Sequence, residues 1–165
     1  MDLLENVIKL GISPVESLQV LTCMFAGIFA GCSLYVAVVE APSRVDLPIH
    51  SLWEQWATSF KRGAIFIPIL SLCMAMSSGA VYYLSSSSPV RTLWLVPVGS
   101  CVFSVIYTAI VMGPEIKILL EKDVITKKGN DWTKQAIARW VRRHYIRVVA
   151  ILITFLVSVF AAVKS

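Results

Sequence analysis

The sequence predicts an all-α integral membrane protein in which four helices form a bundle. Four stretches carry no charged residue: 17–39, 63–90, 92–114 and 148–163. About 20 apolar residues in a helix cross a hydrocarbon layer of roughly 30 Å, and three of the stretches reach that length. Hydrophobic residues make up 57% of the 165 residues and the mean hydropathy is +0.75, which leaves too little polar surface to cover a soluble globule.

These observations predict one membrane domain over residues 1–165, embedded in a lipid bilayer. The residues expected to cross the membrane are approximately 18–39, 63–84, 92–112 and 145–163. All four cysteines lie inside the apolar stretches without a CxxC spacing, so they are interpreted as small hydrophobic residues.

The distribution of basic residues predicts the orientation of the bundle. Of the 15 Lys and Arg residues, 12 lie in the two connections that join span one to span two and span three to span four. Because cytoplasmic loops are enriched in Lys and Arg, we expect these connections in the cytoplasm, or in the matrix of a mitochondrion. Both termini are then lumenal or exterior. Anionic lipid headgroups account for the net charge of +5, so no nucleic-acid partner is expected.

Two helical extensions are expected on the basic side. After Pro42, the side chains of Leu52, Trp53, Trp56 and Phe60 recur at helical spacing beside polar neighbours, which predicts an interfacial helix between spans one and two. A helix capped near Asn130 or Asp131 runs without a breaker into the last apolar stretch, so span four is expected to have a helical cytoplasmic extension. A break or bend is expected in span three at residues 113–114, where glycine precedes proline, followed by a helix that leaves the membrane.

An internal repeat supports a bundle of two hairpins. Residues Tyr35–Pro42 match Tyr107–Pro114 in the pattern Y-x-A-φ-V-x-[A/G]-P, where φ is aliphatic. Each copy is followed by Trp-x-x-x-aromatic at the start of the next span, as Trp56–Phe60 and Trp140–His144. We therefore expect two parallel helical-hairpin repeats about an axis along the membrane normal.

Ionisable side chains at the basic ends of all four spans define a candidate site. Such groups are costly at membrane depth, so they pair or line a hydrated cavity. The candidate catalytic residues are His144 as acid or base, Arg147 to hold an oxyanion, and Glu40 or Glu115 as the partner of His144. The candidate substrate-binding residues are Tyr107, Thr108, Trp56, Trp140 and Arg62.

Simpler interpretations of these residues exist, and other chemistries find less support. Lys and Arg at helix ends reach headgroups, and Glu40 and Glu115 can simply pair with them.

The two histidines, His50 and His144, are far apart and show no metal-ligand spacing, so no metal is expected. Because no GxGxxG or Walker loop occurs, no cofactor is expected either.

Several short motifs in a fixed order resemble one family. They are Gly27, Gly31 and Pro42 in span one, W-x-x-x-F-x-R-G from Trp56 to Gly63, Thr108 with P-x-x-x-x-L from Pro114 to Leu119, and W-x-x-x-H-x-x-R from Trp140 to Arg147. Together, over about residues 20 to 162, they resemble the anthrone oxygenase-like family of small four-span membrane proteins, most of which have no known function. Many relatives have Asn where this chain has Ile116, so one polar contact is expected to be missing.

The resemblance implies an activity that the residues alone do not specify. Characterised relatives oxidise an anthrone to an anthraquinone with molecular oxygen, without a metal or flavin. For this chain it implies a lipophilic aromatic substrate from the bilayer, proton removal by His144 or a nearby carboxylate, and stabilisation of the oxyanion by Arg147. The alternative is a non-enzymatic accessory or structural subunit, in which the Gly27 and Gly31 face and the basic loop contact a membrane protein partner or another copy of the chain.

Overall fold

Helices account for nearly all of the computed structural model, which describes residues 11, 13–85 and 89–165. The elements in chain order are α2 (Pro14–Tyr35), η1 (Val36–Glu40), α3 (Ala41–Ser43), α4 (Ile49–Leu84), η2 (Arg91–Trp94), α5 (Leu95–Tyr107), η3 (Thr108–Met112), α6 (Gly113–Leu119), α7 (Val124–Lys128) and α8 (Asn130–Lys164). This part of the chain contains no strand. The all-α prediction is confirmed.

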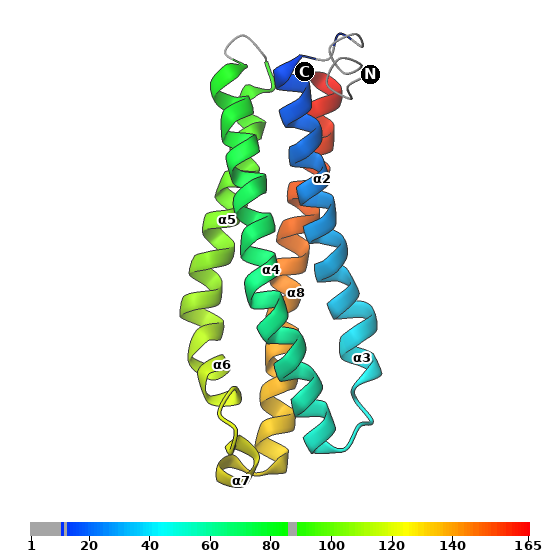
Figure 1. The fold of residues 1–165 in the computed structure, drawn as a ribbon, viewed down its shortest axis with the longest axis vertical. Coiled ribbons are helices and arrows are strands. Elements are labelled where there is room, and N and C mark those ends of the chain that lie inside the picture. The colour runs from blue at the N-terminus through cyan, green and yellow to red at the C-terminus, as the bar shows by residue number, and fades with distance from the viewer. Residues whose placement is uncertain (1–10, 12, 86–88) are drawn as a thin grey trace, which may run out of the picture.

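The elements join into four long columns, each long and apolar enough to cross a membrane. Span one is α2-η1-α3, span two is α4, span three is η2-α5-η3-α6 and span four is α8. The start of α2 and the end of α8 lie at one end of the bundle, which we call the terminal end (Figure 1). The opposite end, with α7 and the connection from α3 to α4, is the basic end. A multi-pass membrane protein follows from these four helices.

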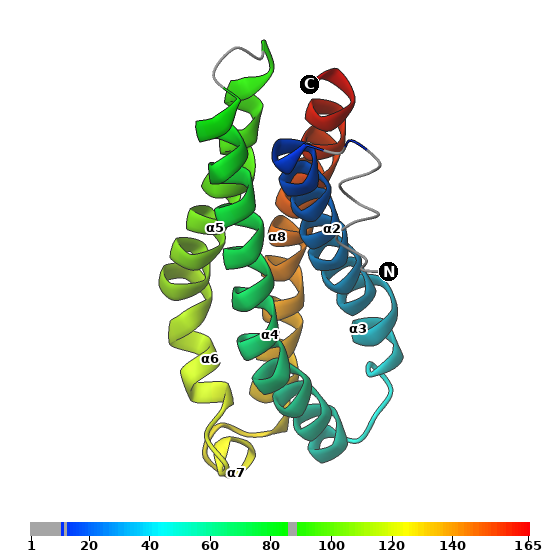
Figure 2. The same cartoon turned by 45° about the horizontal axis from the view of Figure 1, so that its top comes forward.

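Spans two and four form the centre of the bundle. Helix α2 packs against α4 and α8, and α5 packs against the same two helices. Both views place α2 and α5 on opposite sides of the α4–α8 pair (Figures 1 and 2). The largest buried cluster lies at the basic end and comprises Leu52, Trp56, Ala57, Met112, Ile116, Leu119, Ala136, Ile137 and Trp140. The middle of the bundle is filled by Ala26, Phe29, Ala30, Leu70, Met74 and Ile151.

The extension of span four agrees with the prediction, and the interfacial helix differs from it. Helix α8 is continuous over 35 residues and follows Gly129, whose positive φ of 84° suits glycine. Helix α4 is also continuous, so the segment expected as a separate interfacial helix is the first part of span two. Its inward residues Leu52 and Trp56 pack on α6 and α8, and Trp53 Nε1 donates to the Leu119 carbonyl at 2.7 Å. Protein partners therefore replace the headgroup layer on that face.

Two π-helical segments occupy equivalent positions in the two sequence repeats. The segments η1 (Val36–Glu40) and η3 (Thr108–Met112) are each five residues long, and each is followed by Ala-Pro or Gly-Pro. Proline has no backbone N–H and its ring crowds the carbonyl four residues earlier, and the wider π turn relieves this crowding. Where a break or bend was expected, at residues 113–114, the helix continues and the π segment ends directly before it, at Met112. The shared register supports two parallel hairpin repeats.

Candidate functional site

Two stacked pairs of rings form the centre of the candidate site, and we call them the aromatic cluster. The Trp56 and Phe60 rings on α4 stack at 5.4 Å between centroids, and the Trp140 and His144 rings on α8 stack at 5.1 Å. Trp140 meets Trp56 and Phe60 edge-on, at 5.7 Å and 6.2 Å. Residues four apart lie on one helix face, so each Trp-x-x-x-aromatic motif supplies one pair. The cluster therefore joins the two sequence repeats.

A backbone contact determines which ring nitrogen of neutral His144 carries the proton. His144 is 6% exposed, and its Nε2 lies 3.2 Å from the Ser33 carbonyl oxygen on α2. A carbonyl only accepts hydrogen bonds, so in the neutral ring Nε2 carries the proton and Nδ1 keeps its lone pair. Nδ1 is buried and has no hydrogen-bond partner among the described residues. The ring thus holds a free basic nitrogen inside the bundle.

Four more polar atoms of the predicted site residues are buried without a partner in the described part of the chain. They are Trp56 Nε1, Trp140 Nε1, Thr108 Oγ1 and Arg147 Nε. Unpaired buried polar groups cost free energy, so natural structures retain few of them. Arg147 follows His144 by three residues on the same face of α8. Each of these atoms can donate a hydrogen bond to a ligand group that reaches it.

The first π segment ties span four to span one beside this site. Backbone hydrogen bonds in η1 reach back five residues, as from Ala41 to Val36. The next bond in this register would come from Pro42, which has no N–H to offer the Ala37 carbonyl. The Tyr145 hydroxyl donates to that carbonyl instead, at 3.0 Å. A side chain of α8 thus satisfies a carbonyl that the proline leaves open.

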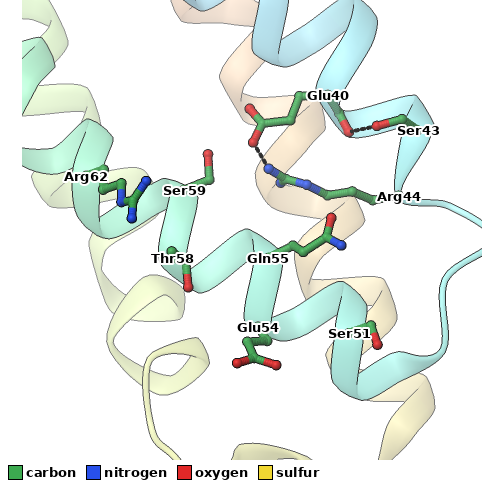
Figure 3. A pocket seen from close by; sticks show the side chains of 9 residues that line it. All are labelled: Glu40, Ser43, Arg44, Ser51, Glu54, Gln55, Thr58, Ser59 and Arg62. Carbon is green, nitrogen blue, oxygen red and sulfur yellow. Dashed lines mark hydrogen bonds and ion pairs between the residues drawn. The ribbon is translucent and has the colours of Figure 1, made fainter.

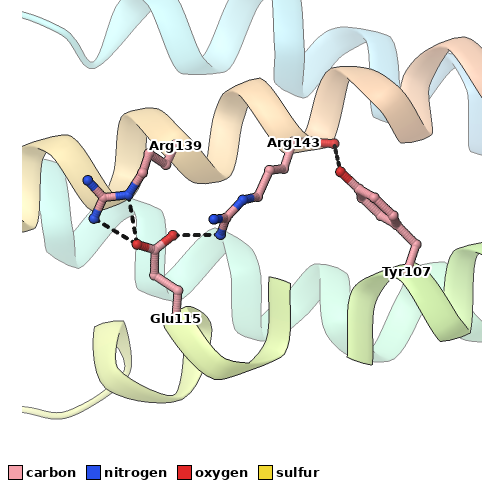
Figure 4. Close-up of polar contacts among 4 residues, drawn as sticks. All are labelled: Tyr107, Glu115, Arg139 and Arg143. Carbon is pink, nitrogen blue, oxygen red and sulfur yellow. Dashed lines mark hydrogen bonds and ion pairs between the residues drawn. The ribbon is translucent and has the colours of Figure 1, made fainter. Parts of the chain in front are cut away.

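Glu115 is engaged by two arginines of α8 (Figure 4). Arg139 Nε donates to its Oε1 and Arg143 Nη1 to its Oε2, each at 2.8 Å. Glu115 therefore joins α6 to α8 through these two arginines. The contact expected between Glu115 and His144 is not among its described contacts. The i, i+4 spacing of Arg139 and Arg143 is the sequence feature that could have indicated that both arginines bind one carboxylate.

Tyr107 and Ile116 complete the face of span three toward α8. The Tyr107 hydroxyl donates to the Arg143 carbonyl at 3.5 Å, and its ring stacks on Phe103 at 5.5 Å between centroids. Ile116, the position at which many relatives have Asn, is buried in the apolar cluster of the basic end. Apolar packing therefore occupies the place of the polar contact that the resemblance led us to expect.

Glu40 and Arg62 line a groove of about 620 Å³ between α3 and the first turns of α4 (Figure 3). Glu40 forms an ion pair with Arg44, whose residue exposure is 5%. Burial lowers the pKa of Arg44, but an arginine keeps its charge at neutral pH, so the pair is neutral overall. Glu40 therefore pairs with Arg44. Among the described contacts, neither Glu40 nor Glu115 contacts His144, although both were expected as its partners.

The two glycines proposed as a contact face have different surroundings. A Cβ at Gly27 would lie 3.1 Å from the Phe155 ring of α8, so Gly27 permits close packing inside the bundle. A Cβ at Gly31 would meet no described atom within 4 Å. The close approach that Gly27 allows is therefore between two helices of the same chain.

The chain was compared with protein families, curated proteins and solved structures. A family model described as anthrone oxygenase matches residues 56–157 of this chain. The matched region contains the aromatic cluster, Thr108, Glu115 and Arg147. No match was found among curated proteins or among solved structures.

Proposed function

Because the chain belongs to the anthrone oxygenase family, and because His144 holds an unpartnered Nδ1 beside stacked aromatic rings, we propose that it oxidises a lipophilic aromatic substrate with molecular oxygen. The family match supports the reaction class. The single observation that carries the proposal is the contact of His144 Nε2 with the Ser33 carbonyl, since a carbonyl only accepts and so leaves Nδ1 as the acceptor of the ring.

The substrate class follows from the surroundings of this nitrogen. Trp56, Phe60 and Trp140 supply aromatic surface suited to a flat polycyclic compound that partitions into the bilayer. The unpaired donors of Trp56, Trp140 and Arg147 suit an oxygen substituent on that compound. The proposed substrate therefore carries an acidified CH₂ group and a phenol or ketone oxygen on the same ring system.

The first proposed step is removal of a proton from the CH₂ carbon by His144 Nδ1. The C–H bond breaks, and its electron pair spreads into the ring system and onto the oxygen substituent. Arg147 and the indole N–H groups stabilise the negative charge on that oxygen. The imidazolium that forms keeps its Nε2 proton on the Ser33 carbonyl.

Molecular oxygen is the oxidant in the second proposed step. The carbanion transfers electrons to O₂, a carbon–oxygen bond forms, and the imidazolium returns a proton to give a hydroperoxide. Loss of water from the hydroperoxide leaves a ketone at the former CH₂ carbon. The balance is R₂CH₂ + O₂ → R₂C=O + H₂O, so the substrate is oxidised and O₂ is reduced.

Oxygen uptake by the purified protein in detergent, with a simple anthrone as substrate, tests the proposal. We expect the His144→Ala variant to lose activity by about 10²- to 10⁴-fold, the usual contribution of a general base. His50→Ala is the matched control, because His50 is the other histidine of the chain and is exposed. Its rate should equal that of the wild type.

Two outcomes would count against an enzyme of this kind. Equal rates for the wild type and His144→Ala, with tryptophan fluorescence showing both folded, would remove His144 as the base. Background rates for all three proteins with several anthrones would favour the non-enzymatic alternative. Purification of the native protein with a stoichiometric membrane partner would then support that alternative directly.

A further inference from the structure

The groove between α3 and α4 has the features of a second binding site, distinct in its contacts from the aromatic cluster. Two arginines and two carboxylates line it, together with hydroxyl and amide groups. Glu40 is already neutralised by Arg44. Arg62 lies in the same groove, and no described residue forms a hydrogen bond or ion pair with it (Figure 3). Glu54, the second carboxylate of the lining, precedes Arg62 by eight residues on α4, which is roughly 12 Å along the helix axis at 1.5 Å per residue. The four charges of the groove sum to zero, and the guanidinium of Arg62 is a positive charge without a described partner.

The position of Arg62 in the chain places this charge at headgroup depth. Arg62 directly precedes the uncharged stretch 63–90 of span two, and Glu40 directly follows the uncharged stretch 17–39 of span one. The groove thus lies where the apolar parts of two spans end. Polar groups at that level meet lipid headgroups in a bilayer.

An apolar stripe continues from the groove toward the middle of the bundle. Phe66 and Ile69 follow Arg62 by four and seven residues, so the three share one face of α4. Phe66 is 50% exposed and Ile69 is 56% exposed. Arg62 and the hydroxyl of Ser59, one turn earlier, thus stand at the head of an apolar surface that is open to acyl chains.

We propose that this groove binds the phosphate group of a phospholipid, with Arg62 and Ser59 as its donors and the Phe66–Ile69 stripe along an acyl chain. Arginine is suited to this role because its planar guanidinium can donate two hydrogen bonds to phosphate oxygens. The Glu40–Arg44 pair on the other side of the groove adds no net charge. The site is independent of the proposed oxidation.

Native mass spectrometry of the detergent-solubilised protein, titrated with phosphatidylglycerol, phosphatidylethanolamine or phosphatidylcholine, tests this site. We expect one tightly retained phospholipid, and about tenfold weaker binding in Arg62→Gln, as for loss of a charge-assisted hydrogen bond. Lys61→Gln is the matched control, because it removes the same charge from the neighbouring residue, which does not line the groove. The affinity of Lys61→Gln for the phospholipid should stay within about twofold of that of the wild type.

The remaining arms identify the source of the phosphate. Diacylglycerol, which has the acyl chains without the phosphate, should not occupy the site. Inorganic phosphate at the same concentration as the lipid should not displace the lipid, since it lacks the contact with the stripe. Equal weakening by Arg62→Gln and Lys61→Gln would reduce the site to general attraction by the basic end and overturn the proposal. Full displacement by inorganic phosphate would overturn its lipid part.

Discussion

At His144 a backbone carbonyl determines which ring nitrogen is free. The Ser33 carbonyl holds the Nε2 proton, so Nδ1 has the lone pair through which the ring can accept a proton. No side-chain pattern predicts this contact, because any residue at position 33 supplies a carbonyl. The sequence could therefore nominate His144 as a base, and its tautomer required the arrangement of α2 against α8.

Glu115 carries a prediction at the same scale, about stability. Glu115→Gln removes a charged acceptor from Arg139 and Arg143, whose side chains are 30% and 33% exposed. Since the network is partly screened by solvent, we expect unfolding in detergent to become easier by about 1–2 kcal/mol. Asp123→Asn, in an exposed pair with Lys127, is the control and should change little. Equal losses of unfolding free energy in the two variants would show that the Glu115 network stabilises the fold no more than an exposed ion pair does.

The π segments are the elements whose energetics can be tested most directly. Tyr145→Phe removes the donor to the Ala37 carbonyl, and we expect it to lower stability by about 1 kcal/mol in the wild type. In a Pro42→Ala background residue 42 has an N–H that can reach the same carbonyl, so the loss should fall close to zero. Thermal unfolding of the four proteins in this double-mutant cycle measures the coupling. Additive effects would mean that the proline does not leave the carbonyl open.

Element by element, the apolar stretches were the strongest predictors. They predicted the four long helices, and the unbroken polar extension of span four followed from the lack of a breaker after Gly129. The segment containing Trp53 and Trp56 was expected in the membrane interface because its amphipathic pattern does not distinguish lipid headgroups from a protein face. The partners of Glu115 were missed for a similar reason. Helical spacing shows on which face of its helix a residue lies, but it does not show which residues of other helices that face contacts.

For the whole molecule, the basic end predicts which side of the membrane each loop occupies. Thiol labelling with a membrane-impermeant reagent tests it, in sealed membrane vesicles of known orientation and in a variant whose four cysteines are replaced by alanine. A cysteine at exposed Thr126 should react where the cytoplasmic or matrix face is outward, and one at exposed Ser165 should react where the opposite face is outward. The reverse labelling pattern would show that the orientation is the opposite one.

The pairing of Trp56 with Phe60 and of Trp140 with His144 has a consequence for regiochemistry. The two hairpins bring nearly equivalent ring pairs to a common centre, yet a single ring of the four contains a basic nitrogen. A flat ligand admitted beside these rings would meet them in either of two opposite orientations. If the proposed oxidation holds, only one of them places a given carbon beside Nδ1, so a duplicated scaffold with chemistry in one half would select one edge of a nearly symmetrical molecule.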